Sequence, residues 1–201
     1  MIVSAASSFE ARVKVTLENQ VIQGGPSMKL LGVTIDQDGS FKTHVSNLRR
    51  KLRSRTWALS KLKKRGLQEK DLVKTYKSLI RPVVEYAAPA WHSLLTATQA
   101  AELERQQVQA LKNVYGTGIS AEKMRKEAGI ELLSARREKM ARKFALKTLS
   151  NERTSHWFTE RKRSVYARRE SVNHPKYKEN TARTDRYRNS PKNYLTRMLN
   201  E

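Results

Sequence analysis

The sequence contains no cysteine, which excludes disulfide bonds and thiolate metal sites. It also has no stretch approaching the roughly 18 uncharged apolar residues of a transmembrane helix. The first residues, MIVSAASSFE, lack the basic start and long apolar core that are typical of a signal peptide. We therefore expect an intracellular protein, nuclear or cytoplasmic and not secreted, with no membrane partner.

Motifs for catalysis and metal binding are missing as well. The four histidines are scattered, and no HExxH zinc motif, GxxxxGK[ST] phosphate loop or GxSxG nucleophile motif occurs. Asp36 and Asp38 form a close carboxylate pair, but Asp38 precedes Gly39, so a turn is the better interpretation than a metal site. The sequence predicts no catalytic residue, no metal and no cofactor.

Positive charge is what the sequence has in excess. Its 41 Lys and Arg residues outnumber 19 Asp and Glu residues, which gives a net charge of +22 and a pI near 10.5. Residues 49–65 hold nine basic residues and no acidic one. Like charges one helical turn apart destabilise a helix by roughly a few tenths of a kcal/mol per pair, so this run needs an explanation. Binding to a phosphate backbone is the best one.

The expected nucleic-acid-binding residues all lie in this run. The partner would be RNA or an RNA/DNA duplex, held by contacts to its backbone. Trp57 either stacks on a base or packs against a neighbouring helix, and the large surface of an indole favours packing. The candidate residues are Arg49, Arg50, Lys51, Arg53, Arg55, Trp57, Lys61, Lys63, Lys64 and Arg65.

Apolar periodicity predicts a mainly α-helical fold. Residues 13–22 and 28–36 are rich in Val, Ile, Leu and Thr and are typical of strands. Helical spacing of apolar residues follows, with Ser40 as the cap of the first helix, a kink at Pro82, and Leu133, Met140 and Phe144 along one side of the last helix. The five predicted helices cover about 40–66, 68–82, 98–114, 120–128 and 131–149.

The last quarter of the chain shows little periodicity and is basic, so residues 151–201 are predicted to form a poorly ordered tail. The expected organisation has three parts. Residues 1–39 form a short β-hairpin, residues 40–150 form the helical domain, and residues 151–201 form the tail.

Four segments carry a resemblance to a known family. They are KLLGVTID with GSFKTH (29–44), LVKTYKSLIRPVVEYAAPAWH (72–92), LERQQ (103–107), and AGI (128–130) followed by Leu133, Arg136 and Arg137. In this order they resemble the region after the catalytic palm in reverse transcriptases of non-LTR (LINE-type, jockey-like) retrotransposons. The part between Tyr76 and Trp91 is the most specific. The resemblance covers residues 26–150 well and 175–200 weakly.

The resemblance implies that the N-terminal hairpin is a remnant of the palm. It implies a thumb-like bundle at 40–150, which in polymerases holds the primer–template duplex by its backbone. The adjacent aspartates that bind the catalytic metals of this family have no counterpart in the chain. The expected function is therefore that of a nucleic-acid-binding fragment of an RNA-directed DNA polymerase, without enzymatic activity of its own. A stand-alone basic RNA- or DNA-binding protein, or a ribosome-associated protein, is the alternative.

Overall fold

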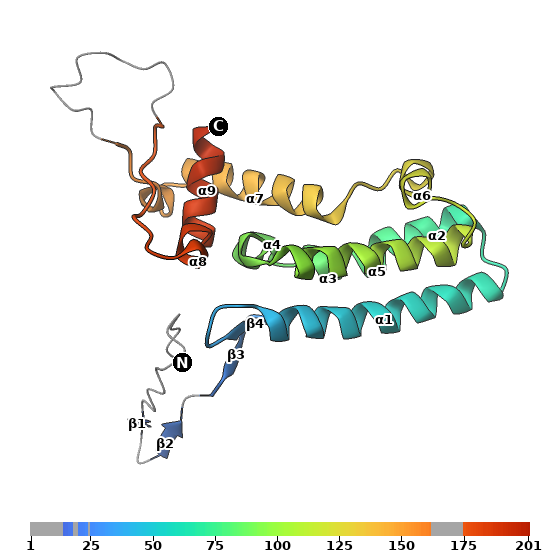
Figure 1. Ribbon diagram of the computed structural model, residues 1–201, viewed down its shortest axis with the longest axis horizontal. Coiled ribbons are helices and arrows are strands. Elements are labelled where there is room, and N and C mark those ends of the chain that lie inside the picture. Colours follow the sequence, from blue (N-terminus) through green and yellow to red (C-terminus); the bar gives the residue numbers. More distant parts are fainter. Residues whose placement is uncertain (1–13, 18–19, 24, 162–174) are drawn as a thin grey trace. The chain divides into compact units, whose positions relative to one another are not determined.

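The structure is a computed structural model that describes residues 14–17, 20–23, 25–161 and 175–201. It is mainly α-helical, with short antiparallel β-hairpins ahead of the first long helix (Figure 1), which confirms the predicted class. The chain forms two compact units. Met1–Ala87 and Leu95–Ser134 make up the first unit, and Ala88–Leu94 joins Ala135–Glu201 in the second.

Both segments predicted as strands contain a reversal of the chain. In the first, Glu18, Asn19 and Gln20 already indicated a turn, whereas the reversal in the second was not predicted. Strand β1 (Lys14–Leu17) pairs with β2 (Gln20–Gln23), and β3 (Ser27–Leu30) pairs with β4 (Val33–Asp36), each antiparallel. Leu31 (φ 46°) and Gly32 (φ 86°) form the turn between β3 and β4. Two successive positive φ values define the type I′ turn, whose twist matches that of the strands it joins. In residues 28–36, apolar residues lie on both sides of so tight a turn, which is why the sequence did not reveal this second reversal.

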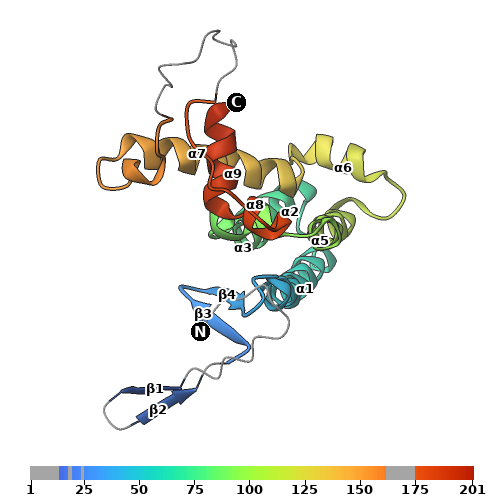
Figure 2. The ribbon, with the colours of Figure 1, turned by 60° about the vertical axis from the view of Figure 1, so that its left-hand side comes forward.

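Helix α1 (Lys42–Lys64) is the longest helix and forms as predicted. Its buried side consists of residues spaced by three, four and seven, as the sequence requires for a helix that packs on one face. This side lies against α5 (Ala97–Tyr115) and β4, and Figures 1 and 2 both show α1 and α5 side by side. The buried apolar residues of α1 are Val45, Leu48, Leu52 and Leu59.

The start of α1 is capped differently from the prediction. The Asp36 carboxylate accepts a hydrogen bond from the Thr43 N–H at 3.1 Å, and the Ser40 hydroxyl donates to the same oxygen at 3.3 Å. Ser40 thus supports the capping carboxylate and does not itself cap the helix. Asp38 accepts the Ser40 N–H at 2.9 Å, which is the turn that the sequence indicated.

The predicted break at Pro82 is present as a change of helix type. Helix α2 (Glu69–Thr75) passes through a π-helical turn (Tyr76–Ile80) into α3 (Arg81–Glu85). Proline has no N–H to donate, and its ring clashes with the carbonyl four residues earlier in a regular α-helix. The wider π-helical turn ahead of Pro82 accommodates both effects. Helix α6 (Ala121–Ala128) completes the first unit.

The second unit contains α4 (Ala88–Trp91), most of α7 (Leu133–Ser150), α8 (Asp185–Arg188) and α9 (Pro191–Asn200). Its apolar core joins α7 and α9 through Ala141, Ala145, Phe158, Tyr177, Leu195 and Met198. The prediction of a poorly ordered tail is therefore wrong for residues 151–161, where Phe158 enters this core, and for residues 175–201. Residues 162–174 of that predicted tail lie outside the described residues.

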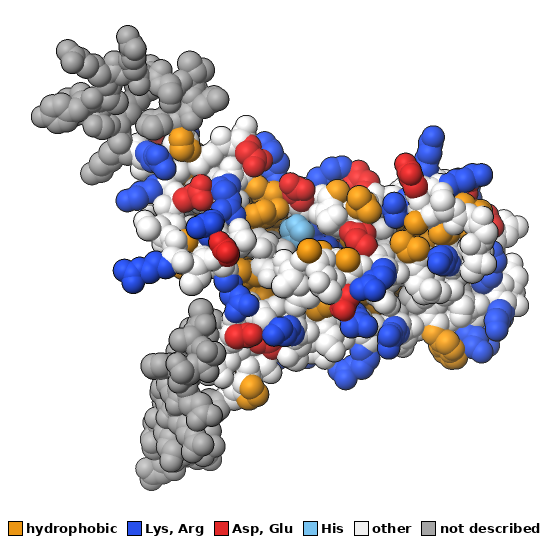
Figure 3. All heavy atoms as spheres, in the orientation of Figure 1, with side chains coloured by type: hydrophobic (Ala, Val, Ile, Leu, Met, Phe, Trp, Pro, Cys, Tyr) orange, Lys and Arg blue, Asp and Glu red, His pale blue; other side chains and the backbone are white. Residues whose placement is uncertain are grey.

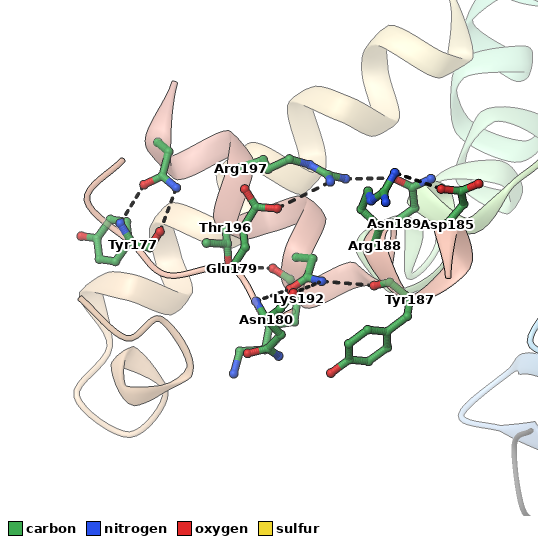
Figure 4. Close-up of polar contacts among 12 residues, drawn as sticks. Tyr177, Glu179, Asn180, Asp185, Tyr187, Arg188, Asn189, Lys192, Thr196 and Arg197 are labelled. Carbon is green, nitrogen blue, oxygen red and sulfur yellow. Dashed lines mark hydrogen bonds and ion pairs between the residues drawn. The ribbon is translucent and has the colours of Figure 1, made fainter. Parts of the chain in front are cut away.

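Two asparagine side chains on α9 hydrogen-bond to the backbone of residues that precede this helix. Asn193 accepts the Asn180 N–H at 2.9 Å and donates to the carbonyls of Asn180 and Tyr187, each at 3.2 Å (Figure 4). Asn200, seven residues further along the helix, accepts the Tyr177 N–H at 2.8 Å and donates to its carbonyl at 3.0 Å. These amides satisfy backbone groups as another strand would.

The buried side of α7 also differs from the prediction. Leu133, Ala141 and Ala145 are buried, whereas Phe144 is 40% exposed and Met140 is half-buried. Ala141 and Ala145 are small, so neighbouring segments can approach this side of α7 closely. Met140 and Phe144, which helical spacing placed on one side with Leu133, are less buried.

Candidate nucleic-acid interface

The basic residues of α1 fall into groups because a helix turns by about 100° per residue. The side opposite its buried face carries five exposed residues, separated by three or four positions: Arg50, Arg53, Trp57, Lys61 and Lys64. We call this set the outer stripe. From Arg50 to Lys64 there are 14 residue-to-residue steps, or about 21 Å at 1.5 Å per residue. Figure 3 shows Lys and Arg side chains along the lower edge of the molecule, where α1 lies.

Trp57 lies at the centre of the outer stripe. It is 63% exposed, and the Lys61 ammonium is 5.1 Å from the centroid of its ring. The interpretation that Trp57 packs against a neighbouring helix is therefore wrong. The indole lies on the side of α1 that faces away from α5.

Three other predicted residues contact the rest of the first unit. Arg49 forms an ion pair with Glu102 of α5, with 3.1 Å between Nη1 and Oε2. Lys63 lies 3.7 Å from the Glu69 carboxylate and donates to the carbonyl of Val114, and Arg55 donates to the carbonyl of Leu79. We call Arg49, Arg55 and Lys63 the inner cations. They join α1 to neighbouring elements, a role that the charge count alone did not reveal.

The last two predicted residues are exposed but lie outside the outer stripe. Arg65 follows the end of α1. Lys51 is on the flank of the helix near His44, where its charge adds to the effect of burial in lowering the pKa of that imidazole. The ten predicted residues therefore do not form a single surface.

The outer stripe has no acidic neighbour on its own helix, because no Asp or Glu occurs between Lys42 and Gly66. Within the part of the chain that the structure describes, the carboxylates that form ion pairs with α1 are those of Asp38, Glu69 and Glu102. They contact Lys42, Lys63 and Arg49. The ion pairs of α1 thus use cations outside the stripe, which leaves an uncompensated positive potential along its outer side.

Two residues from the resemblance segments form an interior hydrogen bond that sequence reasoning did not reveal. Gln107 donates through Nε2 to the Tyr76 hydroxyl and to the Glu131 carbonyl, both at 3.1 Å. Tyr76 is 1% exposed, and burial raises its pKa to about 12. Polar residues at buried helix positions were the available signal, because a buried side-chain amide requires hydrogen-bond partners.

A second interior cluster lies in the other unit. Arg137 is fully buried, its Nε donates to His92 Nδ1 at 3.3 Å, and its guanidinium carbon is 5.7 Å from the Trp91 ring centroid. Burial, with a smaller contribution from the Arg137 charge, lowers the pKa of His92 to about 4. The imidazole is therefore neutral near pH 7 and can accept this hydrogen bond.

The described ranges contain no group of three or more His, Asp or Glu side chains arranged to hold a metal ion. None of the helices in those ranges has the length and apolar content that crossing a membrane requires. Comparison with protein-family models, curated proteins and solved structures finds no match to the chain.

Proposed function

We propose that the chain binds the phosphate backbone of nucleic acid through the outer stripe of α1. The observation that carries this proposal is the line of four exposed cations with no carboxylate among them. A solvated helix face normally mixes charges of both signs, because opposite charges one turn apart stabilise it. Phosphates spaced along a nucleic-acid strand supply the opposite charge that α1 lacks.

The inner cations add a second argument. Arg49 and Lys63 have acidic partners, and Arg55 has a backbone carbonyl, so these charges serve the fold. The outer cations make no such contact with another element in the described part of the chain, although Arg50 donates to Asn47 within α1 at 3.0 Å. Their charge is available to a partner.

The resemblance to non-LTR reverse transcriptases suggests which protein this surface belongs to. We propose that the chain corresponds to the post-palm, thumb-like part of such an RNA-directed DNA polymerase and that it lacks polymerase activity alone. Reading the coding sequence upstream of Met1 tests this origin. An in-frame segment that encodes adjacent aspartates after an aromatic residue and Ala supports it, and unrelated upstream sequence favours the stand-alone binding protein.

Salt-dependent binding tests the interface itself. Fluorescence anisotropy with a labelled RNA/DNA hybrid would compare the wild type with the double variant Arg50→Gln, Arg53→Gln. Removing one cation that binds a phosphate should reduce the slope of log K against log salt by about one, so the double variant should show a slope smaller by about two. The matched control is Lys123→Gln, Lys126→Gln, which removes the same charge from exposed positions of α6 in the same unit. Equal slopes for the two double variants would contradict the proposed interface.

A further inference from the structure

Trp57 is flanked symmetrically by the four cations of the outer stripe. Arg53 and Lys61 lie four residues away on either side, and Arg50 and Lys64 lie seven residues away. Along the axis of α1 these separations correspond to about 6 Å and 10 Å. One aromatic ring therefore lies at the centre of the outer stripe, with two cations at matching distances on each side.

The exposure of Trp57 has no explanation in the packing of the first unit. The large apolar residues Val45, Leu48, Leu52 and Leu59 face the core of that unit. Trp57 is thus a single ring among cations and does not belong to an apolar face. An interfacial membrane helix needs such a face, rich in Trp, Phe or Leu, and on α1 the apolar face is already covered by the protein.

The position of Lys61 leaves room for a ligand on the indole. Its ammonium is 5.1 Å from the ring centroid, and Trp57 is still 63% exposed with this contact in place. An aromatic ring stacks on the flat face of a base, whereas cations beside it contact the phosphates that flank that base. Both kinds of group occur together on this one helix side.

We infer that Trp57 stacks on an unpaired base, so that the outer stripe favours nucleic acid with a single-stranded segment over a continuous duplex. This inference rests on the proposed function and names the class of ligand for the same surface. Bases inside a duplex are covered on both faces by their neighbours, and exposing one costs roughly a few kcal/mol. A single strand offers base faces at little cost. RNA and DNA strands both qualify, because every base has a π-face.

The experiment compares two labelled probes, a 15-nucleotide oligo(U) strand and a blunt 15-base-pair duplex of mixed sequence. Trp57→Ala should weaken binding of the single strand about 5- to 150-fold, the range expected for removing one stacked base. Duplex affinity and the salt slope for either probe should stay unchanged, because the cations are intact. Trp57→Phe should keep most of the single-strand affinity. Trp157→Ala, at an indole 46% exposed in the second unit, is the matched control and should change neither affinity.

Fluorescence supplies a second readout on the folded chain. In a Trp157→Phe background, Trp57 is the exposed indole of the described residues, since Trp91 is fully buried. Oligo(U) should quench its emission, and the blunt duplex should leave it unchanged. Circular dichroism melting of Trp57→Ala should match the wild type, because the replaced side chain is exposed.

Two results would overturn the inference and are distinguishable. If Trp57→Ala changes both affinities equally or neither of them, while binding still depends on salt and on Arg50 and Arg53, Trp57 does not stack and backbone binding stands. If binding of both probes is insensitive to salt and to Arg50 and Arg53, the proposed function fails and the inference fails with it.

Discussion

The Glu104 carboxylate on α5 accepts a hydrogen bond from the Ser134 backbone N–H, with 2.7 Å between Oε1 and N. Its other oxygen accepts the Leu133 N–H at 3.2 Å. A helix leaves its first N–H groups without intrahelical partners, and a negative charge at that end is also favoured by the helix dipole. One side chain of α5 therefore satisfies the start of α7.

Replacing this carboxylate should destabilise the chain. Glu104→Ala should lower the free energy of unfolding by about 1.5 to 3 kcal/mol, the usual contribution of hydrogen bonds to a charged group. Glu104→Gln should cost less, because its amide oxygen still accepts one bond. Urea denaturation followed by circular dichroism measures both. Glu127→Ala, at an exposed position of α6, is the control, and a Glu104→Ala variant as stable as this control would rule out the capping role.

The turn between β3 and β4 permits a stabilising substitution. Leu31 is 84% exposed and adopts a φ of 46°, a conformation that costs most L residues about 1 to 2 kcal/mol. Asn tolerates this conformation and precedes Gly in the preferred type I′ turn. Leu31→Asn should therefore raise the free energy of unfolding by about 1 kcal/mol. The carbonyl of residue 31 still accepts the Tyr86 hydroxyl, which is 2.7 Å away in the wild type.

A substitution of the next residue, Gly32, should lower the free energy of unfolding. Gly32 has a φ of 86°, and a Cβ there would lie 3.2 Å from Cε1 of Tyr86. Gly32→Ala should therefore lower the midpoint of the same urea transition that Leu31→Asn raises. If both variants shift the midpoint in the same direction, the turn does not have this conformation in solution.

Protonation of His92 should reduce stability in mild acid. The pKa is about 4 in the folded chain against an ordinary 6.5, because the ring is buried and, to a smaller extent, because the Arg137 charge lies beside it. As the pH falls below about 6.5, the unfolded chain takes up a proton that the folded chain does not. The free energy of unfolding must then decrease until the pH approaches 4.

His92→Gln isolates this effect, since its amide oxygen can still accept the Arg137 Nε–H while the side chain no longer titrates. The loss of unfolding free energy between pH 7 and pH 5 should be smaller in the variant by about 1 to 2 kcal/mol, allowing for solvent screening. Burial also lowers the pKa of His44, but this residue is present in both proteins and its effect cancels. An identical pH dependence in the two proteins would mean that His92 is not held neutral by the fold.

Helical periodicity was sufficient to predict most of the first unit. Leu48, Leu52 and Leu59 repeat at helical spacing, so the long helix and its buried side followed from the sequence. The division of the basic residues of α1 into the outer stripe and the inner cations did not follow from the sequence. Arg49 and Arg50 are adjacent and chemically equal, and only the position of Glu102, 53 residues after Arg49, makes the first an ion-pair partner. Such a difference depends on the tertiary structure.

Trp57 and α9 show two other limits of sequence reasoning. The position of Trp57 off the apolar stripe indicated exposure, but the usual burial of a large aromatic residue favoured packing. In α9, the buried Asn193 and Thr196 interrupt the apolar pattern, and Asn is more typical of turns than of helix interiors. Their partners lie in loop backbone and along α9 itself, so no local periodicity revealed them.

The position of Leu195 in the core of the second unit provides a direct test of order at the C-terminus. Leu195 is 4% exposed and packs in one apolar core with Ala141, Phe158 and Tyr177. Leu195→Ala should lower the free energy of unfolding of this unit by about 2 to 4 kcal/mol, through reduced apolar burial and the cavity that remains. Lys192→Ala, exposed on the same helix, should change it by less than about 0.5 kcal/mol.

Limited proteolysis shows whether Leu195→Ala destabilises the second unit alone. In Leu195→Ala, cleavage within residues 175–201 should accelerate strongly, because cleavage follows the population of the locally opened state. Cleavage within α1 and α5, which belong to the other unit, should stay at the wild-type rate. If residues 175–201 were a disordered tail, Leu195 would be in contact with solvent and its replacement would create no cavity. Its replacement would then alter neither the unfolding transition nor the cleavage rate.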